Sequence, residues 1–229
     1  MLYAKEKFVI YWDATLKEII SMGIGSIVIV LISSVFIGAV TTIQTAYQLV
    51  SNLVPKSTIG AIVSASAILE LAPTIIALVL AGKIGSNIAG QIGTMRVTEQ
   101  IDALDVMGIN SASYLVLPKL LGALIAFPCL CIISVFLIHL GGITAGELTG
   151  ELTFYEFQVG ATRFYEPFQI IFMLTKSLTF GFLIATIASY QGYYVSGGAF
   201  EVGEASTRAV VISCIMILFG DYTLAQLLL

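Results

Sequence analysis

Residues 69–110 read LELAPTIIALVLAGKIGSNIAGQIGTMRVTEQIDALDVMGIN, and this stretch decides how the rest of the chain is interpreted. It begins inside an apolar run, after which small residues recur at every fourth position, at Ala81, Gly85, Ala89 and Gly93. Such a stripe lets a second helix approach closely. A flexible glycine-rich loop is the alternative, but isoleucines keep the same four-residue step on the neighbouring face. The pattern therefore favours a helical extension of the preceding apolar segment.

A short amphipathic helix is predicted next, at residues 95–107. Three apolar residues share one of its sides and three acidic residues another: Val97, Ile101 and Leu104, and Glu99, Asp102 and Asp105. Gly108 supplies a C-terminal stop. Cytoplasmic lipid surfaces are anionic and attract basic helices, so an acidic amphipathic helix on that side is suited to docking on a protein. A solvated connector packed on its own bundle is the alternative.

The composition around this stretch is that of a membrane chain. Of the 229 residues, 58% are hydrophobic and 10% are charged, whereas soluble domains carry about 25% charged residues. A hydrocarbon core about 30 Å thick takes roughly 20 helical residues per crossing, which leaves room for about five or six spans and for no folded soluble domain. The ten Lys and Arg residues are scattered between apolar runs, which excludes nucleic acid as a main partner.

Five spans are predicted from the gaps between charged residues. They cover residues 20–46, 57–82, 120–146, 167–190 and 207–229. Residues 1–19 mix charges with aromatic residues at helical spacing, which predicts an interfacial helix lying on the membrane. The expected fold class is therefore all-α, a polytopic membrane protein with five transmembrane helices, an N-terminal interfacial helix and a short cytoplasmic helix. We expect a single domain over 1–229, divided into 1–19, 20–82, 83–119 and 120–229.

The positions of Lys and Arg predict the orientation in the membrane. With the N-terminus in the cytoplasm, seven basic residues lie on the cytoplasmic side and two, Lys56 and Arg163, lie in outer loops. The C-terminus is then outside. The outer loop 141–166 is acidic and aromatic, which predicts an exposed loop with residues reaching the interface. No Cys/His set has metal-ligand spacing, and the single histidine, His139, is expected in an interfacial role near the outer end of the third span.

Three ionisable residues, Glu70, Lys176 and Asp221, fall inside the predicted spans. Each costs about 2.5–3.5 kcal/mol at the bilayer centre, so each needs a partner or water. Lys176 and Asp221 match in depth, which favours an ion pair between them. Pro73 cannot donate to the carbonyl of Leu69, so the helix is expected to bend beside Glu70. A purely structural role is open for the pair, and Glu70 could instead be hydrogen-bonded to a neighbouring helix.

Residues 69–110 also resemble the central signature of the MlaE-type permeases, the membrane subunits of ABC transporters that work with MCE-domain lipid-binding proteins. The resemblance continues in YLVLPKLLGALIAFPCL, LTKSLTFGF, EASTRAVV and FGDYTLAQLL, and it covers residues 20–229 in the family's order. The chain departs from the family pattern where Leu69 and Ala72 replace an arginine before the glutamate and a glycine before the proline.

The resemblance implies a permease homodimer with two ATPase subunits, a periplasmic ring of MCE-domain subunits, and phospholipid or a related lipid as substrate. It implies residence in the bacterial inner membrane with a periplasmic C-terminus, and a contribution to outer-membrane lipid asymmetry. The short cytoplasmic helix would be the coupling helix that fits a groove in the ATPase. Its candidate coupling residues are Arg96, Glu99, Gln100, Asp102 and Asp105.

The chain itself is expected not to be an enzyme. The phosphate-loop pattern G-x-x-x-x-G-K-[ST] is absent from the sequence, so ATP with Mg²⁺ is expected in the partner subunit. No cofactor or metal is expected in this chain. Because five helices enclose little space, the lipid path is expected between two copies. The candidate lining residues lie in the first and fifth spans, at Ile32, Phe36, Val211, Ile215 and Leu218.

An ion-coupled secondary transporter is the alternative function, since intramembrane charges and a proline-bent helix could serve proton or sodium coupling. Such folds usually show two repeated halves, and five spans without an internal repeat do not divide in that way. An intramembrane enzyme is disfavoured because HExxH is absent and no nucleophile with a nearby base stands out. The permease is therefore the preferred interpretation.

Overall fold

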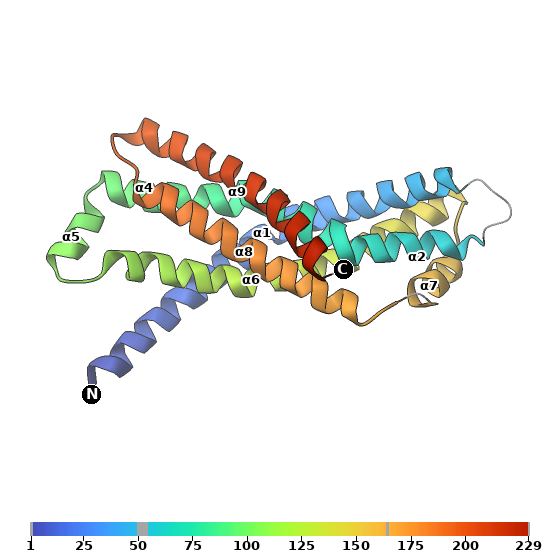
Figure 1. Cartoon of the computed structure of the whole chain (residues 1–229), viewed down its shortest axis with the longest axis horizontal. Helices are drawn as coiled ribbons and strands as arrows, with labels where there is room; N and C mark the ends of the chain where they lie inside the picture. Colours follow the sequence, from blue (N-terminus) through green and yellow to red (C-terminus); the bar gives the residue numbers. More distant parts are fainter. Residues whose placement is uncertain (1, 50–54, 164, 229) are drawn as a thin grey trace. The chain divides into compact units, whose positions relative to one another are not determined.

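The computed structural model describes residues 2–49, 55–163 and 165–228, and the secondary structure within these ranges is helical (Figure 1). The elements in chain order are α1 (Leu2–Gln48), α2 (Ser57–Ser66), the π-helix η1 (Ala67–Ile75), α3 (Ile76–Leu80), the π-helix η2 (Ala81–Gly85), α4 (Ser86–Val97), α5 (Gln100–Val106), α6 (Ser111–Thr149), α7 (Phe154–Arg163), α8 (Phe168–Tyr193) and α9 (Ala199–Leu228).

Five helical runs within the described residues are long and apolar enough to cross a membrane. They are Tyr11–Gln48, Ser57–Val97, Ser111–Thr149, Phe168–Tyr193 and Ala199–Leu228. The all-α, five-span fold class predicted from the charge gaps is therefore confirmed. Each run extends beyond the predicted span, because the polar residues at the ends of the apolar segments continue the helix.

The expected interfacial helix 1–19 is not a separate element in the structure. Helix α1 runs without interruption from Leu2 to Gln48. No proline or turn sequence separates residues 19 and 20, so nothing ends the helix there. Residues 2–19 form the first part of the same helix that continues into the first span.

The second span continues as a helix through residues 81–97, as the small-residue stripe predicts. All four stripe residues, Ala81, Gly85, Ala89 and Gly93, are buried. A Cβ atom added to Gly192 of α8 would lie 2.6 Å from the carbonyl oxygen of Ala89, so α4 and α8 pack with their backbones in close approach. Where a bend is expected beside Glu70, the structure has the π-helix η1, in which backbone hydrogen bonds join residues five apart instead of four; the bend itself stays a prediction.

The amphipathic helix begins five residues later than predicted. Helix α4 runs to Val97, and α5 begins only at Gln100. Glu99 lies in the break with φ of +60°, a left-handed conformation that is uncommon for a residue with a side chain. The hydroxyl of Thr98 bonds back to the Thr94 carbonyl at 2.8 Å, which completes the end of α4. The interpretation of 95–107 as one helix is therefore wrong at its N-terminal end.

The predicted stop at Gly108 is present. Gly108 has φ of +73°, its N–H donates to the Asp105 carbonyl at 3.0 Å, and the N–H of Ile109 donates to the Leu104 carbonyl at 3.1 Å. This pair of bonds is the Schellman arrangement, which requires the left-handed conformation that glycine adopts most easily. Figure 1 shows α5 as a short helix between the end of α4 and the start of α6.

The outer segment 141–166 is not the exposed loop that its composition predicts. Helix α6 continues to Thr149, and a further helix, α7, covers residues 154–163. Thr153 and Glu156 form a capping box: the Thr153 N–H and hydroxyl both donate to Glu156 Oε2, at 2.9 and 2.8 Å. The T-x-x-E spacing in the sequence is a helix-start signal that could have revealed α7.

Contacts divide the chain into two compact units, each built from separate stretches of sequence. One contains the residues up to Ser26, Ala77–Pro128 and the residues from Leu178 onward, and the other contains Ile27–Ile76 and Cys129–Ser177. The second unit has an apolar core that includes Ala67, Ile138 and Met173. In the first unit, Ile84, Ile88 and Ile92 are buried beside the small-residue stripe.

Candidate functional site

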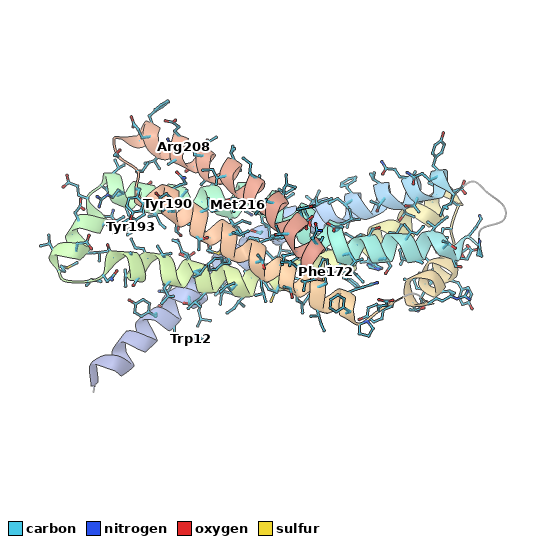
Figure 2. All side chains as sticks on the ribbon, in the orientation of Figure 1. Trp12, Phe172, Tyr190, Tyr193, Arg208 and Met216 are labelled. Carbon is cyan, nitrogen blue, oxygen red and sulfur yellow. The ribbon has the colours of Figure 1, made fainter. Side chains whose placement is uncertain are left out.

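The second unit holds a buried lysine among polar and aromatic partners. Lys176 on α8 is fully buried, and its Nζ donates to Glu70 Oε1 at 2.8 Å and to the Leu69 carbonyl at 3.1 Å. The same Nζ lies 4.6 Å from the centroid of the Phe172 ring, one turn earlier on α8 and labelled in Figure 2. An ammonium group with a carboxylate, a carbonyl and an aromatic face around it is stabilised as a cation inside a membrane.

Pro73 explains why the Leu69 carbonyl is available to the lysine. In a regular α-helix this carbonyl would accept from the N–H four residues later, which is position 73, and proline has no N–H. Lys176 donates to it instead. The sequence predicts the loss of the regular α-helical donor at position 73, and the structure shows that Lys176 donates to this carbonyl within the π-helix η1.

The carboxylate of Glu70 is the exposed part of this cluster. Its side chain is 47% exposed, whereas that of Lys176 is 0% exposed. Thr74 Oγ1 donates to Glu70 Oε2 at 3.3 Å, which helps to hold the carboxylate in place. The arrangement leaves Glu70 able to accept further hydrogen bonds from outside the unit. Sequence reasoning missed the Glu70–Lys176 pair because it matched partners by depth alone.

Asp221 lies on α9 in the first unit, whereas Lys176 belongs to the second. The predicted Lys176–Asp221 ion pair therefore joins residues of different units. It stays a prediction.

His139 makes its contacts within the second unit, and the interfacial role expected for it stays a prediction. Its ring is half-buried and lies on edge against the ring of Phe157, with 5.9 Å between the centroids. Nδ1 lies 2.7 Å from the Val135 carbonyl, and Nε2 lies 2.9 Å from Ser64 Oγ. A carbonyl only accepts, so Nδ1 carries a proton. His139 thus links α6 to α2 inside the second unit.

The candidate coupling residues surround the break between α4 and α5. Arg96 Nη1 pairs with Asp102 Oδ1 at 2.7 Å, which ties the last turn of α4 to the first turn of α5. Ile101 is fully buried, and Glu99, Gln100 and Asp105 are exposed. The structure thus separates the five predicted residues into a surface ion pair, Arg96–Asp102, with side chains 36% and 56% exposed, and three further exposed side chains.

An exposed apolar tip on α5 was not singled out from the sequence. Val106 is 90% exposed and Met107 is 65% exposed, directly after Asp105. Both residues are apolar and lie outside the i, i+4, i+7 pattern of the apolar side, which is the sequence signal that could have revealed them. The exposed surface of α5 therefore combines carboxylates with an apolar end.

A second buried lysine was also missed. Lys119 lies one residue before the predicted third span, within α6, and its side chain is only 7% exposed. Its Nζ donates to Glu18 Oε1 and to Gln91 Oε1, both at 2.6 Å, and so joins α1, α4 and α6. Nearby in sequence, Ser111 at the start of α6 bonds to the hydroxyl of Tyr193, at 2.8 Å, near the end of α8 (Figure 2).

The predicted lipid-path residues all have outward-facing side chains. Their exposed fractions are 52% for Ile32, 67% for Phe36, 53% for Val211, 60% for Ile215 and 55% for Leu218. The helices that carry them, α1 and α9, bury 22% and 17% of their most apolar windows, against 44–50% for the other three spans. Because the residues belong to different units, a common lining stays a prediction.

These features define an all-α, multi-pass membrane protein that carries charges inside its spans and a short exposed helix between the second and third spans. Comparison with known proteins narrows this class. The family model described as Permease MlaE matches residues 15–227. The chain therefore belongs to the MlaE permease family.

Curated relatives agree with this assignment. A probable ABC transporter permease of Rickettsia bellii is 37% identical over 218 residues, which are 95% of this chain and 84% of that protein. A probable ABC transporter permease of Synechocystis is 36% identical, covering 93% of this chain and 81% of that protein. The Arabidopsis thaliana chloroplast protein Trigalactosyldiacylglycerol 1 is 31% identical, covering 95% of this chain and 62% of that protein. The chain is thus a permease subunit of the ABC transporter type.

Proposed function

We propose that this chain moves phospholipid or a related lipid between the bacterial inner membrane and a periplasmic MCE-domain partner, and so contributes to outer-membrane lipid asymmetry. The observation that carries the proposal is membership of the MlaE permease family. A relative whose name is that of a diacylglycerol glycolipid supports a lipid substrate. The broad apolar exposure of α1 and α9 is what acyl chains require, since each buried methylene contributes about 0.8 kcal/mol.

The proposed assembly is a homodimer with a separate ATPase subunit, oriented with the N-terminus in the cytoplasm and the C-terminus in the periplasm. The exposed side of α5 would dock in a groove of the ATPase. Glu99, Gln100 and Asp105 would face basic groups of that groove, and Val106 would contact apolar side chains at its bottom. ATP and Mg²⁺ belong to the ATPase, because the chain lacks a phosphate-loop motif. The seven-to-two distribution of basic residues supports the orientation.

Reconstitution tests the function directly. The chain is co-purified with its ATPase and MCE-domain partners, bound lipid is identified by mass spectrometry, and transfer of fluorescent phospholipid between proteoliposomes and the MCE-domain subunit is followed with and without ATP. Transfer that requires ATP is the expected result. Transport driven by a proton or sodium gradient in the absence of the ATPase would favour the secondary transporter instead.

A further inference from the structure

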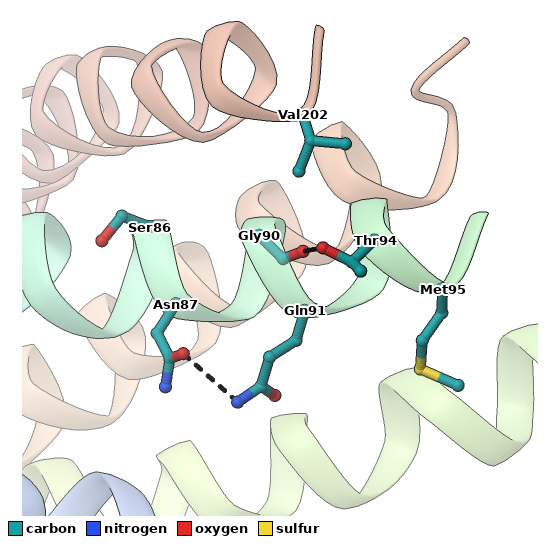
Figure 3. Close-up of a pocket in the computed structure, with 7 residues that line it drawn as sticks. All are labelled: Ser86, Asn87, Gly90, Gln91, Thr94, Met95 and Val202. Atoms are coloured by element: carbon teal, nitrogen blue, oxygen red, sulfur yellow. Dashed lines mark hydrogen bonds between the residues drawn. The ribbon is translucent and has the colours of Figure 1, made fainter. Parts of the chain in front are cut away.

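Helix α4 and Val202 of α9 line an open groove of about 720 Å³ in the first unit (Figure 3). The volume is within the range of small-molecule sites, roughly 300–1,000 Å³. Most of the lining side chains from α4 are amides and hydroxyls, among them Ser86, Asn87, Gln91 and Thr94.

The predicted second span ends at residue 82, so Asn87, five residues further along the helix, would lie about 7.5 Å beyond the hydrocarbon core, at the level of lipid headgroups. Residues Ser57–Val97 form a run of 41 residues, about twice the roughly 20 needed to cross a 30 Å core. The α4 end of the run therefore lies beyond the hydrocarbon, on the side that the proposed function assigns to the cytoplasm. Lys83, one turn before Asn87, is the first charged residue of the run after Glu70.

A chain of hydrogen bonds fixes the direction in which Asn87 presents its amide. Lys119 is an ammonium group without an acceptor, so the Gln91 oxygen must face it. The Gln91 nitrogen is then turned to Asn87 and donates to Asn87 Oδ1 at 3.2 Å. Figure 3 shows the amide nitrogen of Asn87 pointing away from Gln91. The buried Glu18–Lys119 pair thus orients two amides in sequence.

The Asn87 nitrogen is the main donor that the groove offers. The structure records no hydrogen bond from Asn87 Nδ2 to any described residue, and the side chain is exposed. The neighbouring hydroxyls have committed their protons, because Ser86 donates to the Gly82 carbonyl and Thr94 donates to the Gly90 carbonyl. Their oxygens remain acceptors. A ligand that fits this groove accepts a hydrogen bond from Asn87 Nδ2 and donates hydrogen bonds to the hydroxyl oxygens of Ser86 and Thr94.

We propose that this groove binds the phosphodiester of a lipid headgroup, with Asn87 Nδ2 donating to a phosphate oxygen. The hydroxyl or ammonium of the headgroup then donates to Ser86 or Thr94. The inference rests on the proposed function and deepens it, because it names where a membrane lipid is first recognised at the cytoplasmic leaflet. Phospholipids and neutral diacylglycerols can carry the same acyl chains. Only the phospholipid has a phosphate oxygen that can accept the hydrogen bond from Asn87.

The test uses the full chain in detergent and counts bound lipid by native mass spectrometry. The probes are dioleoylphosphatidylglycerol and dioleoylglycerol, which differ only in the phosphoglycerol group. Asn87→Asp keeps the shape and the bond from Gln91 but turns a carboxylate oxygen to the groove, so phosphatidylglycerol binding should fall at least about tenfold. Asn87→Ala should lose about threefold. Gln158→Glu, the same change on the exposed side of α7, should bind as the wild type does.

Four results would overturn the proposal. Asn87→Asp could bind phosphatidylglycerol as the wild type does, or dioleoylglycerol could bind equally well. Equal competition by sn-glycerol 3-phosphate would identify a soluble phosphate compound as the ligand. A disulfide between two copies carrying Asn87→Cys, formed in high yield, would show that a second copy occupies this face.

The outcome is separable from that of the proposed function. If the assembled complex transfers lipid with ATP and Asn87→Asp retains its lipid, the groove assignment alone fails. If Asn87→Asp loses its lipid and the wild-type complex shows no ATP-driven transfer, the groove is a phospholipid site and the transport function fails.

Discussion

At the scale of single residues, the chain compensates for buried charge by local pairing. Lys176 is enclosed by Glu70, the Leu69 carbonyl and the Phe172 ring, and Lys119 is enclosed by Glu18 and Gln91. In each case a fully or nearly buried lysine meets a carboxylate that is more exposed than itself. Removing one partner of a buried pair is strongly destabilising because an uncompensated charge is left behind.

The Glu70–Lys176 pair is expected to show strong energetic coupling. Lys176→Met and Glu70→Gln should each lower the free energy of unfolding by about 2–4 kcal/mol, and the double variant should lose about 1–3 kcal/mol less than the sum. Thermal unfolding in detergent measures all four proteins. The exposed Lys17–Asp13 pair is the matched control, and its coupling should be far weaker because solvent screens both charges.

Strict additivity of Lys176→Met and Glu70→Gln would contradict the pair seen in the structure. The same cycle with Lys176→Ala and Asp221→Ala tests the ion pair predicted from depth. The double variant should be less harmed than the sum of the single ones.

Helix α7 is expected to loosen at low pH. Hydrogen bonds from the Thr153 N–H and hydroxyl lower the pKa of Glu156 below its ordinary value of 4.5. A depressed pKa stabilises the fold above 4.5, and this stability is lost as the pH falls through the lower folded value. Hydrogen-exchange protection of α7, corrected for the intrinsic pH dependence, should therefore decrease below pH 4.5. Glu156→Gln keeps a capping side chain and should remove that pH dependence; an unchanged profile would argue against the carboxylate.

At the scale of elements, two features control the surfaces that this chain presents. The break at Glu99 turns the chain from α4 into α5, and the Arg96–Asp102 bridge holds the two helices together across it. At the N-terminal end of the second helical run, α7 packs against α2 through Gly60 and Gly160. Both elements depend on backbone geometry at one or two positions.

Charge reversal on α5 should weaken binding to the ATPase subunit. Glu99→Lys places a cation where the exposed side of α5 is acidic, so recovery of the ATPase in a detergent pull-down should fall about tenfold while membrane insertion is retained. Glu204→Lys reverses a charge of similar exposure on α9 and should leave recovery unchanged. Wild-type recovery with Glu99→Lys would remove this residue from the docking surface.

The contact between α2 and α7 should not tolerate a methyl group. A Cβ on Gly160 would lie 1.9 Å from the Ser57 carbonyl oxygen, so Gly160→Ala should cost about 1–3 kcal/mol and reduce hydrogen-exchange protection of α7. Gly203→Ala meets nothing within 4 Å, so it should be neutral or slightly stabilising through helix propensity. Equal stability of the two variants would mean that α7 moves away without loss.

At the scale of the whole molecule, the five spans are divided between two compact units. The first and fifth spans, in α1 and α9, have the smallest share of buried residues. Apolar side chains on these helices remain exposed over several turns. In a membrane such surfaces meet acyl chains or another copy of the chain. The lipid path expected from the sequence lies on these two helices.

Photocrosslinkers placed at Phe36 and Leu218 should capture more lipid in the assembled complex than one at Phe182 of α8. Phe182 is 46% exposed, so it controls for simple contact with the surrounding bilayer. Mass spectrometry of the crosslinked products measures the difference. Equal or reversed labelling would place the path elsewhere.

The sequence by itself determined the five spans, the helical extension through the small-residue stripe and the stop at Gly108. These features follow from local periodicity and from residues that restrict their own backbone. Only the tertiary structure decided that Lys176 meets Glu70, that Lys119 is buried, and that α7 packs on α2. Which side chains meet depends on the rotation and axial position of one helix against another, and residue spacing within a single helix does not specify either.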